Sequence, residues 1–211
     1  IHPPLWFQQK KRVGGTKNIQ LDIIHTLQPD LVLANKEENN KQQIEQVQQD
    51  YPVWVSNIQT LQDAMHMIET IGTLVHREEE AFCLCEKILT EKEKFAIQTK
   101  QKALYLIWRE PYMAAGSDTF IQDMMSYAGF ENCLTQTRYP VLSIEEIKQL
   151  NPGIILLSSE PYPFKEKHIL ELQHHLPSSN ICLVDGELFS WYGSRLLHSF
   201  SYFATLHEQL A

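Results

Sequence analysis

The strongest constraint on the fold is an internal repeat. One copy covers residues 21–38, LDIIHTLQPDLVLANKEE, and the other covers residues 144–161, IEEIKQLNPGIILLSSEP. At a constant offset of 123 residues, the copies share residue types at several positions, which include Ile24/Ile147, Leu27/Leu150, Pro29/Pro152, Leu33/Leu156 and Glu37/Glu160. Self-similarity at a fixed offset is the sequence signature of a repeated structural unit. The chain is therefore predicted to form two similar lobes.

Each copy of the repeat predicts a short helix followed by a buried strand. Apolar residues three or four positions apart indicate the helix, and Pro29 or Pro152 ends it, because proline has no backbone N–H and disfavours a helical residue before it. The apolar runs at 31–34 and 154–157 are typical of strands covered on both faces, as in parallel sheets. Further helices at 41–49 and 165–176 lead to further strands at 52–55 and 181–184. Each half is thus predicted to be a right-handed crossover unit of an α/β sheet.

A long helical stretch separates the two halves. Residues 58–74 and 78–100 both carry apolar side chains at helical spacing, without proline, and Gly72 lies near the junction. A helical stretch of this length is rigid enough to act as a backbone between lobes. We therefore predict an α/β fold with an N-terminal lobe at 1–57, a backbone helix at 58–102 and a C-terminal lobe at 103–211, each lobe with a mostly parallel central sheet. Because residues 1–57 contain no counterpart of the strand at 103–108, we expect the first lobe's opening strand and helix to lie outside this sequence.

Aromatic and charged residues gather in the loops that follow the predicted strands. Ligands of open α/β sheets bind outside the carboxyl ends of the strands. Aromatic walls suit a large, partly apolar ligand, and arginine binds carboxylates or phosphates through two parallel hydrogen bonds. The alternative for any single ring is packing in the core. The predicted ligand contacts are Lys36, Glu37, Trp54, Trp108, Arg109, Tyr112, Arg138, Tyr162, Phe189, Trp191 and Tyr192.

Composition and motifs exclude several other classes of function. A net charge of −8 argues against a nucleic-acid partner, which requires a basic surface. The chain contains no nucleophile elbow and no glycine-rich phosphate loop, so we predict that it is not an enzyme. Nine histidines and four cysteines show no metal-ligand spacing, and we expect neither a metal site nor a cofactor. His2 is kept as a candidate cleft residue.

Two glutamates occupy matching positions in the repeat. Glu37 and Glu160 each follow the first strand of their copy. One interpretation makes them groups on the rim that contact the other lobe or dock onto a partner. The other makes each of them the N-terminal cap of the helix that follows.

Several segments resemble the helical-backbone metal receptors, the substrate-binding proteins of ABC importers for cobalamin and ferric siderophores. They are VGGTKN, LQPDLVLANKEEN, YMAAGSDTFIQDMMSYAGFEN, LNPGIILLSSEPYPFKEKH and VDGELFSWYGSRLL. The resemblance covers almost the whole chain and implies a fold like class III periplasmic binding proteins, with a shallow ligand cleft between two lobes. It further implies a corrinoid or ferric-chelate ligand, an ABC permease as partner, a monomer, and a place in the periplasm or cell envelope.

The cobalamin branch of this family looks most similar, and Trp54 matches a cleft aromatic residue there. That branch docks onto its permease through one acidic residue on each lobe, and the matching positions here are Lys41 and Ser190. The resemblance therefore suggests nearby acidic residues in that role: Glu37, Glu38, Glu160 and Glu187. The alternative function is a cytoplasmic protein that handles or senses a corrinoid or metal chelate without a permease. The N-terminus of the full gene product distinguishes the two, because only an exported receptor needs a signal or lipid anchor.

Overall fold

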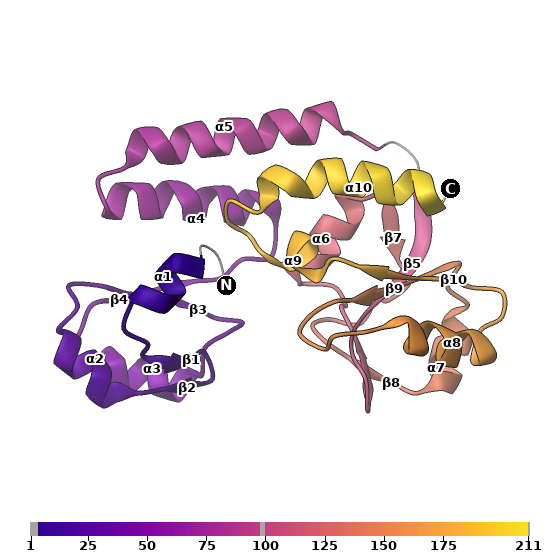
Figure 1. Ribbon diagram of the computed structural model, residues 1–211, viewed down its shortest axis with the longest axis horizontal. Helices are drawn as coiled ribbons and strands as arrows, with labels where there is room; N and C mark the ends of the chain where they lie inside the picture. The colour runs from indigo at the N-terminus through magenta and orange to yellow at the C-terminus, as the bar shows by residue number, and fades with distance from the viewer. Residues whose placement is uncertain (1–3, 98–99, 211) are drawn as a thin grey trace. The chain divides into compact units, whose positions relative to one another are not determined.

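The computed structural model describes residues 4–97 and 100–210, so His2 lies outside the described residues. Backbone contacts divide the chain into two compact units, Ile1–Ile58 and Gln59–Ala211 (Figure 1). Within the described residues, no helix is long and apolar enough to cross a membrane. The proposed division at 57 and 102 stays a prediction, although the first boundary lies next to the end of the first unit.

The first unit contains one complete copy of the repeat. Its elements are α1 (Pro4–Gln9), β1 (Gly14–Gly15), β2 (Asn18–Ile19), α2 (Leu21–Leu27), β3 (Val32–Asn35), α3 (Lys41–Val47) and β4 (Val53–Ser56). Strands β3 and β4 are parallel, with Leu33 opposite Trp54. Helix α3 begins at Asn40, whose side chain accepts hydrogen bonds from two backbone N–H groups of the first turn. This cap supplies acceptors for donors that a helix start otherwise leaves unpaired.

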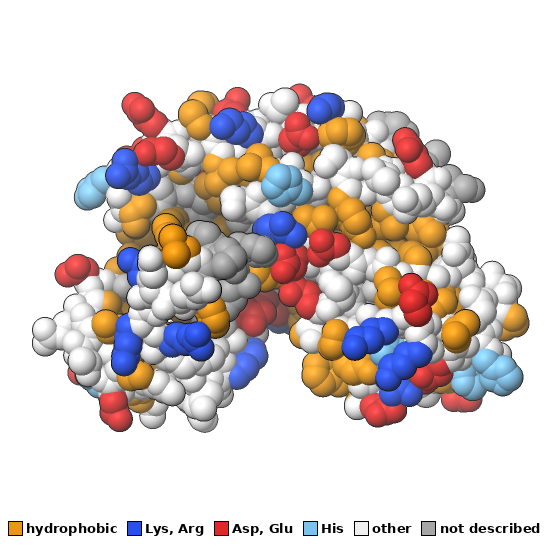
Figure 2. Space-filling model, viewed as in Figure 1, with side chains coloured by type: hydrophobic (Ala, Val, Ile, Leu, Met, Phe, Trp, Pro, Cys, Tyr) orange, Lys and Arg blue, Asp and Glu red, His pale blue; other side chains and the backbone are white. Residues whose placement is uncertain are grey.

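Two helices open the second unit and pack side by side: α4 (Leu61–Leu74) and α5 (Glu78–Lys94) (Figure 1). A Cβ on Gly72 would lie 2.4 Å from the Cβ of Ala81, so glycine allows this close approach. The backbone of His76 has a φ of +56°, and the N–H of Arg77 donates to the carbonyl of Gly72 at 2.7 Å, which closes the turn. The two helical segments predicted at 58–74 and 78–100 are confirmed in type. Because the chain turns back at 75–77, they pack against each other and do not form the single backbone helix that the family resemblance implied. Figure 2 shows apolar side chains at the surface of this pair, where Leu74, Val75 and Phe82 are exposed.

A mixed six-stranded sheet forms the centre of the second unit, in the order β10-β9-β5-β6-β8 with β7 beside β5. The strands are β5 (Gln101–Trp108), β6 (Tyr112–Ala114), β7 (Phe130–Asn132), β8 (Val141–Leu142), β9 (Ile154–Ser158) and β10 (Asn180–Val184). The predicted parallel pairing holds for β5, β7, β9 and β10. Strand β6 pairs antiparallel with β5, because the chain reverses direction at residues 109–111. Strand β8 then pairs antiparallel with β6.

Helices cover both faces of this sheet: α6 (Phe120–Tyr127), α7 (Ile144–Leu150), α8 (Glu166–His175), α9 (Gly186–Ser190) and α10 (Leu196–Leu210). Leu104 and Ile155 point to one face, where they pack with Ile147 of α7 and Leu172 of α8. On the other face Tyr105 packs against Phe189 of α9, which in turn packs against Phe203 of α10. Side chains alternate between the faces of a strand, so the buried run of β5 and β9 serves both layers.

The repeat predicted from the sequence is present in the structure. Helix α2 ends at Gln28 with a φ of +48°, and α7 ends at Asn151, 123 residues later, with a φ of +46°. Beyond the first strand of each copy, the N–H of Lys36 donates to the carbonyl of Ser56 and the N–H of Ser159 donates to that of Val184. The two donors again lie 123 residues apart, and each acceptor is the last residue of the neighbouring strand. Both copies therefore form the same helix–strand unit and close it in the same way.

Candidate functional site

The carboxyl ends of three parallel strands in the second unit bring several predicted ligand contacts to one edge. Strands β5, β9 and β10 are neighbours and parallel, so the loops that follow them meet at the same edge of the sheet. Trp108 ends β5, Tyr162 follows β9, and Trp191 follows the short helix after β10. We call this region the aromatic edge, defined by Trp108, Tyr162 and Trp191.

Trp108 and Tyr162 form a ring pair at this edge. Their ring centroids lie 5.6 Å apart at an interplanar angle of 65°, an edge-to-face arrangement favoured by aromatic rings. The backbone N–H of Tyr162 donates to the carbonyl of Ile107 at 3.3 Å, which ties the loop after β9 to the end of β5. Trp108 remains 39% exposed, so the pair offers an apolar surface to a ligand.

The loop that carries Tyr162 is held by the start of α8. The ring of Tyr162 lies 4.8 Å from that of Phe164 and 5.4 Å from that of His168. His168 is 2% exposed, and its Nδ1 lies 2.8 Å from the backbone N–H of Lys165. Burial lowers the pKa of His168 below its ordinary value, and the nearby charges of Lys167 and Arg109 lower this pKa further. The imidazole is therefore neutral at pH 7 and fixes the position of the tyrosine ring.

Trp191 is fixed by a glutamate of the same edge. Its indole Nε1 donates to Oε1 of Glu160 at 2.7 Å, and the hydroxyl of Ser190 donates to the same oxygen at 2.7 Å. A Cβ on Gly186 would lie 2.4 Å from the Oγ of Ser158 and 2.7 Å from the Cγ of Glu160. Glycine is thus required where α9 approaches the loop after β9. The sequence VDG places it there.

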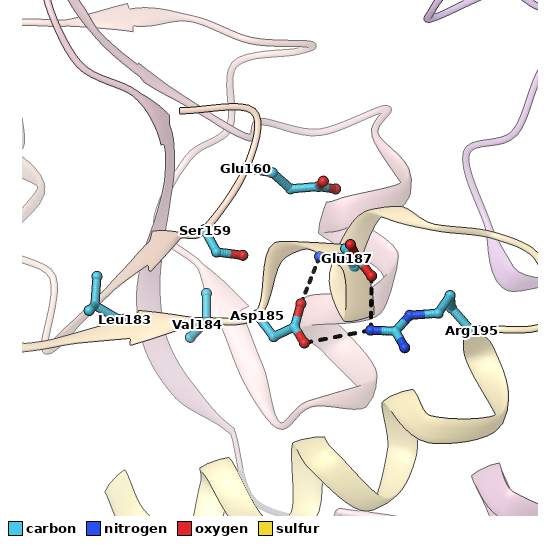
Figure 3. Close-up of a pocket in the computed structure, with 7 residues that line it drawn as sticks. All are labelled: Ser159, Glu160, Leu183, Val184, Asp185, Glu187 and Arg195. Atoms are coloured by element: carbon cyan, nitrogen blue, oxygen red, sulfur yellow. Dashed lines mark hydrogen bonds and ion pairs between the residues drawn. The ribbon is translucent and has the colours of Figure 1, made fainter. Parts of the chain in front are cut away.

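An open hollow of about 580 Å³ lies at the ends of β9 and β10 (Figure 3). In this view the guanidinium of Arg195 reaches the carboxylates of two acidic residues: Nη2 lies 2.9 Å from Oε2 of Glu187 and 3.7 Å from Oδ2 of Asp185. The predicted docking residue Glu187 is therefore paired within the chain. The residues that line the hollow are Ser159, Glu160, Leu183, Val184, Asp185, Glu187 and Arg195.

Arg109 belongs to a hydrogen-bond network between the β5–β6 turn and α8. Oε1 of Glu171 accepts from Nε of Arg109 at 3.2 Å, from its Nη2 at 2.9 Å and from the hydroxyl of Tyr112 at 3.1 Å. The hydrogen bonds from Arg109 hold the pKa of Glu171 below its ordinary value. Burial and the Glu171 carboxylate raise the pKa of Tyr112 to about 12. Arg109 also forms an ion pair with Glu110. An anionic ligand that binds Arg109, as predicted, therefore competes with the carboxylates of Glu110 and Glu171 for the guanidinium group.

We expect Glu171→Gln to lower the free energy of unfolding by about 1–2 kcal/mol at pH 7, because the charged acceptor of three hydrogen bonds is lost. Since the folded protein depresses the pKa of Glu171, this stabilisation is complete above the ordinary value of 4.5 and is lost as the pH falls below it. Urea unfolding at about pH 7 and about pH 3 measures the difference. Glu166→Gln, at an exposed position of the same helix, is the control, and an equal loss for Glu171→Gln at both pH values contradicts the prediction.

Two predicted contacts of the second unit are buried, and one of them is wrong. Phe189 is 0% exposed and packs between Tyr105 and Phe203, with ring centroids at 5.1 and 4.6 Å. It is a core residue, because the single turn of α9 points it under the sheet edge. The ring of Tyr112 is also buried, at 9% exposure.

Two others are placed beside the second unit's loops. Tyr192 packs edge-on against Phe120 with ring centroids 5.4 Å apart. Arg138 adopts a φ of +65° and donates from Nη1 to the carbonyl of Asp118 at 3.2 Å. Neither arrangement tests contact with a ligand, so both stay predictions.

The remaining predicted residues lie in the first unit. Trp54 lies on β4 and is half-buried, and Lys36 and Glu38 are exposed after β3. The side-chain oxygen of Asn35 accepts from the backbone N–H groups of Glu37 and Glu38, at 2.9 and 3.2 Å. This local turn orders the loop that carries three of the predicted site residues.

The alternative role of Glu37 and Glu160 as helix caps is wrong. Asn40, not Glu37, caps α3. Helix α8 begins at Glu166, with Lys165 at the cap position, so Glu160 lies outside it. Glu160 instead accepts hydrogen bonds from Ser190 and Trp191 at the end of α9. In the described part of the chain, no group of three or more histidine, cysteine, aspartate or glutamate side chains is arranged to hold a metal ion.

The sequence model of the family described as periplasmic binding protein matches residues 2–176. The chain belongs to this family. It is 25% identical over 155 residues to a vitamin B12-binding protein of Vibrio parahaemolyticus serotype O3:K6, and 24% identical to one of Vibrio campbellii. Each alignment covers 70% of this chain but 56% of the relative. The chain thus spans little more than half the length of these two periplasmic binding protein relatives.

Solved structures of other binding proteins have a similar fold. The periplasmic vitamin B12-binding protein BtuF of Vibrio cholerae has a TM-score of 0.81 at 19% identity, over 99% of this chain and 85% of that one. The periplasmic heme-binding protein RhuT from Roseiflexus sp. RS-1 has a TM-score of 0.84 at 15% identity, over 99% of this chain and 87% of that one. The predicted α/β, class III type of fold is therefore confirmed. Family membership also confirms that this is a binding protein and not an enzyme.

Several residues of the edge were not predicted from the sequence. Glu171 lies 62 residues from Arg109, and no local pattern connects the two. Arg195 follows the loop of α9 without any periodic signal. For His168 a sequence signal did exist. It lies three residues after the cap position of its helix, where side chains that accept a hydrogen bond from the N–H of the cap residue are common.

Proposed function

We propose that the chain is the ligand-binding part of an ABC importer's substrate-binding protein, which acts in the periplasm or cell envelope and binds a metal chelate, of which a corrinoid is the first candidate. The observation that carries the proposal is the aromatic edge, where Trp108, Tyr162 and Trp191 are positioned at the carboxyl ends of parallel strands in a periplasmic binding protein. Family membership supports a binding role, and two similar relatives are named vitamin B12-binding proteins.

The chemistry of the edge fits a large, flat and partly apolar ligand. Aromatic rings contribute contact area at little cost in conformational entropy, because each has only two rotatable bonds. Here hydrogen bonds to Glu160 and ring contacts to His168 restrict Trp191 and Tyr162 further. A ligand that packs on such pre-ordered rings loses less of its binding energy to the ordering of the protein. We include Trp54 of the first unit among the proposed contacts.

Titration of the protein's tryptophan fluorescence tests the proposal. The ligands are cyanocobalamin, cobinamide, haemin and a ferric hydroxamate siderophore. Binding with a dissociation constant of about 1 μM or tighter, which corresponds to about −8 kcal/mol, is the expected result for one of them. Unchanged fluorescence with all four, together with the absence of heat in calorimetry, excludes the proposed ligand class.

We propose that acidic residues dock the protein onto its permease, and Glu38 is the first choice because it is exposed. Glu37, Glu160 and Glu187 are further candidates, of which Glu187 already pairs with Arg195. Charges at the rim of an interface act mainly on the association rate. Glu38→Lys is therefore expected to slow association with the reconstituted permease about three- to tenfold at low salt, with a smaller effect at high salt. An unchanged rate excludes Glu38, and Lys41→Glu, expected to change the rate in the opposite direction, is the matched control.

A further inference from the structure

The backbone at the start of α8 determines which nitrogen of His168 carries a proton. A backbone N–H can only donate a hydrogen bond, and the N–H of Lys165 lies 2.8 Å from Nδ1 of His168. Nδ1 is therefore the acceptor and carries no hydrogen. A neutral imidazole has one N–H and one bare nitrogen, so its hydrogen is on Nε2.

The surroundings of His168 favour this neutral form. The side chain is buried beneath Tyr162 and Phe164. The charged groups that face it are the cations of Lys165, Lys167 and Arg109 and the single carboxylate of Glu171. Burial and three cations oppose a charged imidazole, and one carboxylate, already engaged by Arg109, favours it.

The tautomer fixes the direction of the next hydrogen bond. Nε2 of His168 lies 3.2 Å from the hydroxyl oxygen of Tyr162. With its hydrogen on Nε2, the imidazole donates and the tyrosine oxygen accepts. The hydroxyl keeps its own hydrogen, and within residues 4–97 and 100–210 no acceptor atom other than those of His168 is found for it.

We propose that His168 is a positioning residue that fixes Tyr162 as a hydrogen-bond donor toward the ligand. The ligand therefore carries a carbonyl or carboxylate oxygen that accepts this hydrogen bond, beside a flat apolar part that packs on Trp108. This inference rests on the proposed function, which it deepens by naming the chemistry of the ligand. Within the aromatic edge, the indole N–H of Trp191 already donates to Glu160, whereas the hydroxyl of Tyr162 keeps a hydrogen whose position is set by His168.

The first arm of the test needs no ligand. Long-range proton–nitrogen NMR spectra of the uniformly ¹⁵N-labelled protein at pH 7 report which ring nitrogen of each histidine is protonated. His168, assigned by comparison with His168→Gln, is expected to show a protonated Nε2 and a bare Nδ1. His174, exposed on the same helix, is the control and is expected to show averaged tautomers. A proton on Nδ1 of His168, or a charged ring, overturns the inference.

The second arm measures the role of the hydroxyl in binding. Tyr162→Phe keeps the ring and removes the O–H group. It is expected to weaken binding of cyanocobalamin, cobinamide, haemin or the ferric hydroxamate siderophore, whichever the unaltered protein binds, about tenfold, the effect of one hydrogen bond. Tyr127→Phe removes a hydroxyl on α6, away from the edge, and is expected to leave affinity within about twofold. Equal affinity of Tyr162→Phe and the unaltered protein overturns the inference.

Two further variants separate positioning from folding. His168→Gln keeps an acceptor for the N–H of Lys165, as glutamine does at this position of helices, whereas His168→Phe removes it. His168→Gln is expected to keep the melting temperature of the unaltered protein and to lose affinity for the ligand as Tyr162→Phe does. If His168→Gln and His168→Phe both retain the affinity of the unaltered protein, the positioning role is overturned. If the unaltered protein binds none of the four ligands of the fluorescence titration, the proposed function fails, while the NMR result still decides the tautomer on which this inference stands.

Discussion

Trp191→Ala is expected to weaken ligand binding by about 10- to 100-fold without loss of the folded state. The indole is half-buried at the aromatic edge, and truncation of an aromatic residue at the centre of a binding surface costs about 2 kcal/mol or more. Each 1.4 kcal/mol changes the dissociation constant about tenfold. Fluorescence of the remaining tryptophans, or calorimetry, measures the affinity, and circular dichroism measures the melting temperature.

The matched variant for this prediction is Trp191→Phe. It keeps an aromatic face but removes the N–H that donates to Glu160, so its affinity is expected to lie between those of the alanine variant and the unaltered protein. The carboxylate of Glu160 still accepts from Ser190 and faces the open hollow, which limits the loss of stability. If Trp191→Ala binds as tightly as the unaltered protein but melts at a lower temperature, Trp191 is a packing residue and the aromatic edge loses one of its three members.

The repeat was predictable because its signals are local. Proline after each helix and an apolar run after each proline mark where a strand begins, and Gln28 and Asn151 end their helices in the same left-handed conformation. The pairing of β3 with β4 and of β9 with β10 then follows from the crossover geometry of parallel strands. Local sequence signals were therefore sufficient to predict the helices, the strands and the strand pairing of the repeat.

The arrangement of the two helices at 58–102 was not predictable in the same way. Apolar spacing indicates a helix and its buried face, but it does not distinguish one long helix from two that pack together. The decision depends on the turn at 75–77, where His76 takes a positive φ that histidine adopts only occasionally. It also depends on Gly72, whose missing side chain lets α5 approach α4. This glycine was visible in the sequence, and its contact with Ala81 was not.

The candidate site shows the same limit. Loops after parallel strands gather at one edge, so the positions of Trp108, Tyr162 and Trp191 could be inferred from strand assignment alone. Which rings of a loop point outward depends on a turn too short to show periodicity. In the segment GELFSWYGS, Phe189 and Trp191 are two residues apart, yet one lies in the core and the other at the edge.

Phe189→Ala is expected to destabilise the second unit by about 3–5 kcal/mol, a larger loss of stability than that expected for Glu171→Gln. The ring is fully buried and contacts Tyr105, Tyr202 and Phe203, with centroids at 5.1, 6.4 and 4.6 Å. Removing it forfeits its burial and leaves a cavity that neighbouring rings fill only in part. Urea unfolding followed by circular dichroism measures the loss.

Phe189→Leu keeps most of the buried volume and is expected to cost less than half as much, because volume-conserving substitutions in a core are the best tolerated. At a temperature where Phe189→Ala remains folded, its affinity for the ligand is expected to equal that of the unaltered protein, since a side chain without exposed surface makes no contact with a ligand. Phe189 and Trp191 thus have opposite expected outcomes although they lie two residues apart. The alanine variant of Phe189 is expected to lose stability and keep its affinity, and that of Trp191 is expected to lose affinity and keep its folded state. A Phe189→Ala variant that keeps its stability and loses affinity would show that the ring leaves the core to meet the ligand, and it would restore the role that the sequence alone suggested for it.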